Sequence, residues 1–377
     1  MDHATTLLQV RELSATFGRH AAAAPVVKGI SFDIAAGEAV GFVGESGCGK
    51  SVTARALMRL APEGSSVRWS GQVLFRGQDL LKLSPAAMQD VRGRRIAMVF
   101  QDPMSSLNPV LTVGAQIDDI IRRHMGLSAA AARQRTVELL GLVGIREPEQ
   151  RANDYPHQFS GGMRQRVLIA IAVSCKPDLL IADEPTTALD VTVQAQILRL
   201  LMRLRRELGM ALMLITHDFG VIAGMVERVY VMLDGSIVET GSTDAVFANP
   251  QHPYTIGLMG AIPSVGDEVE RLTQIDGAMP RLTAIPSGCA FNPRCTRVND
   301  VPDGRCMRER PGLLPAGKTD AACWLHDLRI KTPSPSQGEG RDGGLRARTR
   351  LRQGERIAQQ RRHRAVTGDG GAVDLDE

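Results

Sequence analysis

A glycine-rich segment that ends in a lysine and a serine is the first part of this chain that could do chemistry. The sequence GESGCGKS fits the phosphate-binding pattern G-x-x-x-x-G-K-[ST] at every fixed position, and it lies between an apolar run and a helix-compatible stretch. Glycines in such a loop let successive backbone amides turn towards a phosphate chain. The sequence therefore predicts a phosphate-binding loop made of Gly44, Glu45, Ser46, Gly47, Cys48, Gly49, Lys50, Ser51 and Val52.

Two side chains of this loop have roles that follow from their chemistry. We expect Lys50 to reach the β and γ phosphates of a bound nucleotide, and Ser51 to hold Mg²⁺ through its hydroxyl. Cys48 is expected to be a small filler without a redox function. The alternative is a glycine-rich turn with a chance lysine, which the flanking strand and helix patterns disfavour.

Hydrolysis of a bound phosphate also needs groups that hold Mg²⁺ and activate water, and a pair of carboxylates could supply them. The apolar run Leu179 to Ala182 ends in Asp183 and Glu184, which are followed by Pro185. Ligands collect at the carboxyl ends of buried parallel strands, so we expect Asp183 to hold Mg²⁺ and Glu184 to polarise the attacking water. An isolated Asp-Glu pair is usually a solvated loop, but this pair terminates a hydrophobic strand. With the first motif it predicts ATP hydrolysis.

The segment SGGMRQR, Ser160 to Arg166, resembles the signature of the ATP-binding cassette (ABC) family. A serine and two glycines that open a helix can direct backbone amides and the helix dipole at a γ-phosphate. In that family the phosphate belongs to the ATP held by the partner subunit. The resemblance therefore implies that Ser160, Gly161 and Gly162 complete the partner's site. The alternative is a plain helix N-cap by Ser160.

Four further residues match positions of the same family. Gln101 resembles the Q-loop glutamine that senses Mg²⁺ and the γ-phosphate, Asp190 the D-loop aspartate, and His217 the switch histidine that contacts the γ-phosphate. A lone histidine after an apolar strand is more often structural, but the spacing from Glu184 matches the family pattern. Phe17 is placed to stack on adenine, although the family more often has tyrosine there. A core phenylalanine is the alternative.

The pattern of apolar runs predicts an α/β fold. The resemblance implies the P-loop NTPase fold of an ABC cassette, which has a RecA-like core, an antiparallel β layer and an inserted helical subdomain, here at about residues 104–165. Helical periodicity predicts two helices of this subdomain, at 113–124 and 129–143. Short alternating runs suit strands of the β layer at 7–13, 25–34 and 71–76.

Three regions are expected along the chain. Residues 1–250 would form the ATPase domain and residues 251–328 a small cysteine-containing extension. The tail, residues 329–377, begins with a Pro- and Ser-rich stretch, continues as an Arg-rich run and lacks a hydrophobic face, so we expect it to be disordered.

Composition and hydropathy argue against two classes of protein. The net charge is +4, from 45 basic and 41 acidic residues, which is too small to indicate a nucleic-acid surface. No stretch approaches the ~18 apolar residues needed to span a bilayer, and the start, MDHATTLLQVREL, lacks the basic and apolar regions of a secretory signal. We therefore expect a peripheral protein at the cytoplasmic face of the inner membrane, attached there through partners.

Two stretches narrow the resemblance to one branch of the ABC family. Residues 103–114, PMSSLNPVLTVG, and residues 252–255, HPYT, resemble the ATPases of dipeptide and oligopeptide importers and of their nickel-importing relatives. The resemblance covers about residues 7–325 and is closer to the first of the two paired ATPases. It implies a heterodimer with a second ATPase on two membrane permeases, which an external binding protein supplies. Residues 103–115 would receive a coupling helix from a permease.

Four cysteines form a second candidate site. Cys289, Cys295, Cys306 and Cys323 are separated by five, ten and sixteen residues. Such a cluster in a cytoplasmic protein favours metal ligation over disulfides, but the C-x2-C knuckle of a zinc ribbon is missing. The spacing alone leaves open a metal site or four buried thiols. The sequence GCAFNPRC around the first two cysteines resembles the C-terminal extension of peptide-importer ATPases, which implies a [4Fe–4S] cluster.

Two rival classes share the core motifs. Soluble DNA-maintenance ABC proteins carry long coiled coils or DNA-binding zinc modules, whereas the segment between Lys50 and Ser160 has room only for a helical subdomain. A non-hydrolytic regulatory cassette is disfavoured by the intact Gln101, Glu184 and His217. We predict an ATP-hydrolysing subunit that powers the import of peptides; the alternative within the family is import of nickel or another small solute.

Overall fold

The computed structural model describes residues 6–18, 24–62, 64–187, 189–261, 275, 277 and 286–328. The chain divides into two compact units between Ile237 and Val238, which is earlier than the boundary at residue 250 expected from the sequence. The predicted tail, residues 329–377, lies outside the described residues. In the part of the chain that is described, no helix is both long and apolar enough to cross a membrane.

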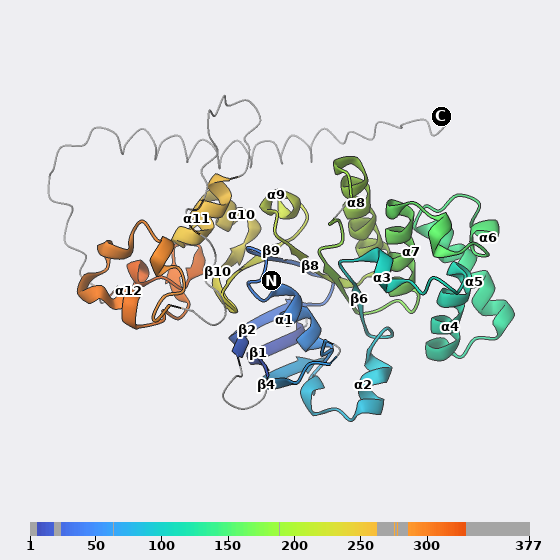
Figure 1. Cartoon of the computed structure of the whole chain (residues 1–377), viewed down its shortest axis with the longest axis horizontal. Helices are drawn as coiled ribbons and strands as arrows, with labels where there is room; N and C mark the ends of the chain where they lie inside the picture. Colours follow the sequence, from blue (N-terminus) through green and yellow to red (C-terminus); the bar gives the residue numbers. More distant parts are fainter. Residues whose placement is uncertain are drawn as a thin grey trace. The chain divides into compact units, whose positions relative to one another are not determined.

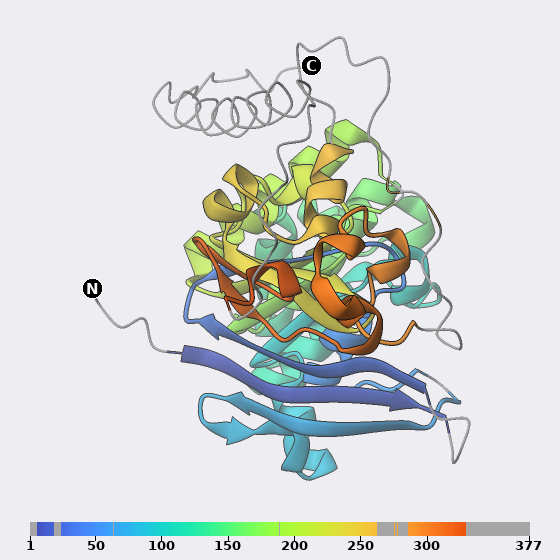
Figure 2. The ribbon, with the colours of Figure 1, turned by 90° about the vertical axis from the view of Figure 1, so that its left-hand side faces the viewer.

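An antiparallel sheet forms one layer of the first unit, and its long strands lie side by side (Figures 1 and 2). The alternation of buried side chains along its central strand shifts at Glu12, where φ is 47°. This bulge returns Leu13 to the buried face. The sheet confirms the predicted β layer, although the sequence indicated only part of each strand. In sheet order the strands are β2 (Ala24–Ala35), β1 (Thr6–Phe17), β4 (Val67–Phe75) and β5 (Gln78–Asp79).

A parallel sheet forms the centre of the first unit. Its inner strands are buried on both faces, which explains why they read as continuous apolar runs in the sequence. Because the strands are parallel, their carboxyl ends lie at one edge, where the loops that carry the predicted site begin. In sheet order the strands are β9 (Arg228–Leu233), β3 (Ala39–Val43), β8 (Ala211–Thr216), β7 (Leu179–Asp183) and β6 (Ile96–Val99).

Helices connect these strands (Figure 1). The longest of them starts where Asp190 accepts a hydrogen bond from Val193 N, and it ends at Gly209, whose φ of 67° suits a glycine. The helices of the core are α1 (Lys50–Leu57), η2 (Leu80–Lys82), α2 (Pro85–Val91), α7 (Gly161–Val173), α8 (Val191–Leu208) and α9 (Phe219–Ile222).

The predicted helical subdomain is inserted between β6 and α7. Thr112 and Ser128 cap its two main helices by accepting hydrogen bonds from backbone amides, and Gly126 ends the first of these helices in the left-handed conformation. The buried faces of both helices carry apolar residues at helical spacing. Its elements are α3 (Pro103–Ser106), α4 (Val113–Met125), α5 (Ala129–Leu142), α6 (Pro148–Arg151) and η3 (Pro156–Gln158).

The second unit contains a small antiparallel sheet and short helices. The sheet is centred on β12 (Thr319–Ala321), which pairs with β10 (Ser236–Ser242) and β11 (Leu314–Ala316). Glu239 is fully buried and accepts hydrogen bonds from the amides of Gln251 and His252, so it ties the sheet to the start of a helix. The helices are α10 (Thr243–Ala248), α11 (Pro253–Gly260), η4 (Asn292–Arg294), η5 (Val298–Asp300), η6 (Pro302–Gly304), α12 (Arg305–Arg308) and η7 (Trp324–His326).

Candidate nucleotide-hydrolysis site and cysteine pocket

The loop between β3 and α1 depends on glycine. Gly44, Gly47 and Gly49 have φ angles of 151°, 82° and 106°. A Cβ atom on Gly44 would lie 2.2 Å from the carbonyl oxygen of Met232, so no larger residue fits there. Since α1 begins directly after Gly49, its amino end faces the loop, as expected of an anion-binding loop. Burial raises the pKa of Cys48, which agrees with a filler role for this thiol.

The side chain of Lys50 is buried beneath the loop. Nζ donates hydrogen bonds to the carbonyl oxygens of Gly44 at 2.7 Å and Glu45 at 3.1 Å. It also lies 3.9 Å from Glu184 Oε1. The ammonium group is thus held at the carboxyl edge of the parallel sheet, next to a carboxylate and within a glycine-rich loop, where a phosphate chain could take the place of the two carbonyls.

Ser51 and Asp183 meet beside this lysine. Ser51 Oγ donates to Asp183 Oδ1 at 2.8 Å, and Asp183 is buried at the end of β7. Burial raises the pKa of Asp183; the negative charge of Glu184 adds to this effect, and the hydrogen bond from Ser51 opposes it. A carboxylate whose ionisation is opposed in this way is stabilised by a nearby cation. The two oxygens are therefore suited to hold Mg²⁺.

Glu184 is at the centre of the site. Its φ of 46° places a non-glycine residue in the left-handed region, and its amide donates to the Ile215 carbonyl at 3.0 Å. Oε2 accepts hydrogen bonds from Gln101 Nε2 at 3.1 Å and from Thr187 Oγ1 at 3.0 Å, and it lies 3.5 Å from His217 Nδ1. The structure thus brings together three residues that the sequence predicted separately, from loops that follow β6, β7 and β8.

Thr187 is the member of this group that sequence reasoning missed. The sequence shows two successive threonines after Pro185, and nothing in their pattern distinguishes Thr186 from Thr187. The available signal is the turn: a residue three positions after Glu184 can return a side-chain donor to it when proline starts a turn between them.

The predicted signature and D-loop lie next to each other. Ser160 caps α7, with its Oγ accepting from Met163 N at 3.4 Å. A Cβ on Gly162 would lie only 2.7 Å from Val193 Cγ1 on α8. Ser160 and Gly161 are exposed, and the hydrogen bond described for Ser160 is made within its own helix, to the amide of Met163. Asp190 caps α8 and is also exposed.

Phe17 ends the strand β1 on the side of the phosphate-binding loop. It pairs with Ala24 of β2, and two residues further on the carbonyl oxygen of Val26 lies 3.0 Å from the position that a Cβ on Gly49 would take. Phe17 is half-buried. Phe17 therefore lies at the end of the sheet that is near the phosphate-binding loop. Residues 19–23, which follow it, lie outside the described residues.

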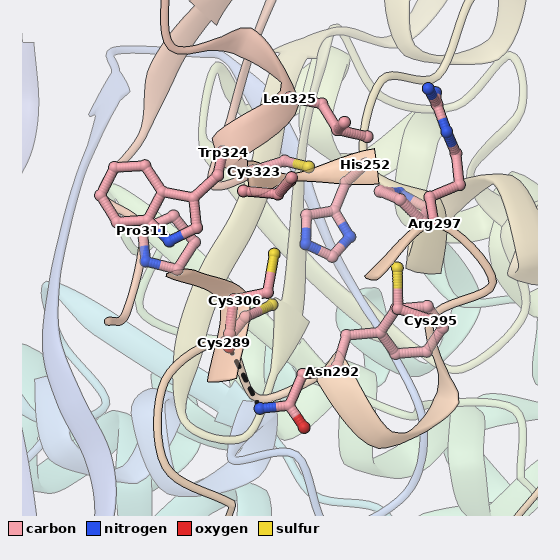
Figure 3. A pocket seen from close by; sticks show the side chains of 13 residues that line it. His252, Cys289, Asn292, Cys295, Arg297, Cys306, Pro311, Cys323, Trp324 and Leu325 are labelled. Atoms are coloured by element: carbon pink, nitrogen blue, oxygen red, sulfur yellow. Dashed lines mark hydrogen bonds between the residues drawn. The ribbon is translucent and has the colours of Figure 1, made fainter. Parts of the chain in front are cut away.

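All four predicted cysteines line one small pocket in the second unit (Figure 3). The backbone amide of Cys289 donates to the Cys306 carbonyl at 2.8 Å, and Figure 3 shows the thiols of these two residues next to each other. Cys295 and Cys323 reach the pocket from other segments. The remaining walls include the rings of His252, Phe291 and Trp324, so the thiols face a largely apolar space.

The environment of the pocket keeps its thiols protonated. Burial, with a contribution from the neighbouring cysteines, raises the pKa of Cys306 to about 11 and that of Cys323 to about 12. Burial also lowers the pKa of His252 to about 3, so its ring is neutral. Among the described residues, no three His, Cys, Asp or Glu side chains lie close enough together to hold one metal ion. The described residues therefore give no evidence for the predicted iron–sulfur cluster.

Two family models match this chain, one in each of its two parts. The family model described as "ABC transporter" matches residues 27–187, and the model described as "Oligopeptide/dipeptide transporter, C-terminal region" matches residues 238–301. The first match contains the phosphate-binding loop, Gln101, the signature and the Asp183–Glu184 pair. The second contains Cys289 and Cys295.

Curated proteins are similar over nearly the whole chain. The dipeptide transport ATP-binding protein DppD of Bacillus subtilis is 47% identical over 326 residues, which are 86% of this chain and 96% of the relative. The oligopeptide transport ATP-binding protein OppD of the same organism is 50% identical over 77% of this chain and 82% of the relative. Among solved structures, a dimeric post-hydrolysis state of the ATP-binding cassette MJ0796 bound to ADP and Pi matches with a TM-score of 0.56 and 28% identity. The match covers 63% of this chain and 98% of that one.

The fold and the site define an ATP-hydrolysing cassette, in which a phosphate-binding loop and a paired carboxylate meet at the edge of a parallel sheet. The chain belongs to the ABC transporter family, among the ATP-binding proteins that resemble DppD and OppD.

Proposed function

We propose that this chain is the ATP-hydrolysing subunit of a peptide importer and that it works at the cytoplasmic face of the inner membrane. The observation that carries the proposal is the meeting of Lys50, Ser51, Asp183 and Glu184 at one edge of the sheet. Similarity to dipeptide and oligopeptide transport ATP-binding proteins over most of the chain supports peptides as the cargo.

The residues of the site divide the reaction between them. Lys50 and the amides of its loop bind the β and γ phosphates, and Phe17 stacks on the adenine ring. Ser51 and Asp183 would hold Mg²⁺, and the ion would supply positive charge next to the phosphates. Glu184 accepts a proton from the attacking water.

Gln101 and His217 complete the site from two neighbouring loops. Both approach Glu184 Oε2, at 3.1 and 3.5 Å. Their positions at the ends of β6 and β8 suit groups that bind Mg²⁺ or the γ-phosphate when nucleotide is present and release Glu184 at the same time.

A second subunit would complete the catalytic arrangement. Ser160, Gly161 and Asp190 are exposed on the surface of this chain, where a partner subunit could reach them. We assign the signature to the ATP of a partner ATPase and propose this chain as the first of two different ATPases.

A groove beside β6 offers a surface for the membrane permeases. It is lined mainly by apolar side chains from β6, α4, α7 and the loop between β6 and α4, including Phe100, Leu111, Ile120 and Leu168, with Asp119 among its polar residues. Val110, in the preceding loop, is 75% exposed. Residues 103–115 border this groove and are the proposed contact for a short helix from one of two permeases, which an external binding protein supplies with peptide.

The cysteine pocket is the proposed site of a [4Fe–4S] cluster. Four thiols, which are the usual ligands of iron–sulfur clusters, line one largely apolar pocket, and this common location is what supports the proposal. A bound cluster would cross-link the segments that carry Cys289, Cys295, Cys306 and Cys323. Protein purified without oxygen should contain about four iron and four sulfide per chain.

Serine variants test this assignment. Cys306→Ser should lose the iron, whereas Cys175→Ser, outside the pocket, should keep it. Zinc in place of iron would keep the ligands and contradict the cluster, and metal-free protein would identify the four thiols as packing residues.

The function as a whole is tested with the complete importer in lipid vesicles. Peptide-loaded binding protein should stimulate ATP hydrolysis, and nickel or DNA should not. Stimulation by nickel alone would assign the chain to the metal-importing relatives, and stimulation by DNA would contradict a transport function.

A further inference from the structure

We propose that Thr187 is a positioning residue for ATP hydrolysis, whose hydroxyl fixes the carboxylate of Glu184 for proton transfer. Thr187 Oγ1 donates to Glu184 Oε2 at 3.0 Å, and both side chains are at most partly exposed. The inference rests on the proposed role of Glu184 and adds to it the residue that holds the carboxylate in place.

Thr187 binds Glu184 at two points. Its amide donates to the Glu184 carbonyl at 3.2 Å, which closes a turn with Pro185 at the second position. Proline is favoured there because its ring fixes φ near the value that this turn needs. Thr187 therefore contacts both the main chain and the side chain of Glu184 from within one four-residue turn.

The backbone of Glu184 is also fixed from the other side. Its amide donates to Ile215 of β8, while its left-handed φ of 46° persists only where the surroundings enforce it. With the main chain held between β8 and the turn, the orientation of the carboxylate depends on side-chain torsions. The hydroxyl of Thr187 is a donor that restrains those torsions from within the same segment.

The other two groups at Oε2 come from different loops. Gln101 follows β6 and His217 follows β8, and both are proposed to turn to the nucleotide when it binds. Thr187 keeps its place in the turn during such a change. Because Thr187 occupies Oε2, the oxygen directed to the phosphate side is Oε1, which lies 3.9 Å from Lys50 Nζ.

Three variants separate positioning from a general structural effect. Thr187→Val removes the hydroxyl but keeps the branched shape and the backbone amide of the turn. Thr187→Ser restores a hydroxyl. Thr186→Val removes the neighbouring hydroxyl and is the matched control. Each is measured in the complete importer, with kcat and KM for ATP determined in the presence of peptide-loaded binding protein.

We expect Thr187→Val to lower kcat by roughly 10- to 100-fold, as for loss of a hydrogen bond to a charged group, with KM changed by less than about threefold. Thr187→Ser should recover most of the rate, and Thr186→Val should behave as wild type. Should the valine variant fail to assemble, Thr187→Ala provides a second hydroxyl-free chain with the same expected loss of kcat.

Two results would overturn the inference: a wild-type kcat in the hydroxyl-free variants, or a serine variant as slow as the valine variant. A loss confined to KM would make Thr187 a binding residue and would also contradict it. Glu184→Gln is measured in parallel. If it too hydrolyses ATP at the wild-type rate, the proposed role of Glu184 fails; if it is inactive while Thr187→Val is not, only the positioning role fails.

Discussion

Glu184 combines an unfavourable backbone angle with a carboxylate that four other side chains approach. Lys50, Gln101, Thr187 and His217 all lie within 4 Å of its oxygens. A left-handed φ on a glutamate costs about 1 kcal/mol or more, so the surrounding contacts must enforce it. Strain and convergent donors on one acidic side chain are typical of a group that reacts.

Replacing Glu184 with glutamine should stop hydrolysis without preventing ATP binding. The amide keeps the shape of the side chain but cannot accept a proton from water, so turnover should fall by about 100-fold or more. Single-turnover hydrolysis and equilibrium ATP binding on the assembled importer check the two halves of this prediction.

Two further variants serve as controls for that measurement. Glu207→Gln removes an exposed carboxylate that pairs with Arg203 on α8, and it should leave hydrolysis unchanged. Lys50→Ala should instead weaken ATP binding itself, because it removes the buried ammonium of the phosphate-binding loop. Equal ATP affinity in wild type and Lys50→Ala would contradict the role of the loop.

The sequence predicts the residue types of the site better than their geometry. Lys50, Ser51, Asp183 and Glu184 could be found because each chemistry demands a particular side chain after a particular strand. The left-handed angle of Glu184 and the hydroxyl of Thr187 could not, since they follow from contacts with β8 and from the closure of a turn. Such contacts leave no periodic trace along the chain.

At the scale of elements, an aromatic cluster joins the two sheets of the first unit. Tyr230 of β9 packs on Phe42 of β3 and on Phe32 of β2, with ring centroids 4.9 and 5.5 Å apart. Its hydroxyl donates to the Asp33 carbonyl at 3.0 Å. This buried phenol thus links the antiparallel layer to the parallel sheet.

The stability of this junction should depend on alkaline pH. Burial raises the pKa of Tyr230 to about 12, above its ordinary value of 10. Between these values the unfolded chain loses the proton and the folded chain keeps it, so the stabilisation present below pH 10 is lost as pH rises. The free energy of unfolding should fall by up to about 1.4 kcal/mol per pH unit from this residue.

Urea unfolding followed by tryptophan fluorescence can isolate this effect. The chain has two tryptophans, and a Trp324→Phe background leaves Trp69 on β4 as the reporter of the first unit. Tyr230→Phe should lower stability by about 1 kcal/mol at neutral pH and should show a shallower decline above pH 10. Parallel declines in the two chains would show that Tyr230 is not the group responsible.

Element boundaries show where sequence patterns stop being sufficient. The sequence pattern after the phosphate-binding loop indicates a helix without fixing its bounds. In the structure α1 runs from Lys50 to Leu57, because Gly49 precedes it in the left-handed conformation and Arg59 has a φ of 50°. The short helix α2 was not predicted at all. Its seven residues are too few to show a helical period, and its start depends on Ser84 capping Ala87 N.

At the scale of the whole molecule, the exposed signature predicts a site shared with another subunit. Gly161→Asp would place a carboxylate where the partner's γ-phosphate is proposed to bind, and the like charges repel. Hydrolysis at the partner's site should be lost, while this chain should still bind its own ATP. Mixed complexes in which only one of the two ATPases carries Glu184→Gln or its equivalent can report the two sites separately.

Gly162→Ala is the companion variant for this experiment. Its Cβ would collide with Val193 Cγ1, so it should disturb α7 and α8 without adding charge. Loss of ATP binding by the isolated Gly161→Asp chain would argue that the signature acts within its own subunit.

The two carbonyls that hold Lys50 have a consequence for the turnover cycle. A buried ammonium without partners would be costly, but Gly44 and Glu45 accept hydrogen bonds from Lys50. A phosphate that binds Lys50, as we propose for ATP, would have to replace these two carbonyls as hydrogen-bond partners of the ammonium group. Inorganic phosphate would have to displace the two carbonyls from Lys50. The polyphosphate chain of ATP could also accept hydrogen bonds from the amides of the loop, so we expect it to bind more tightly.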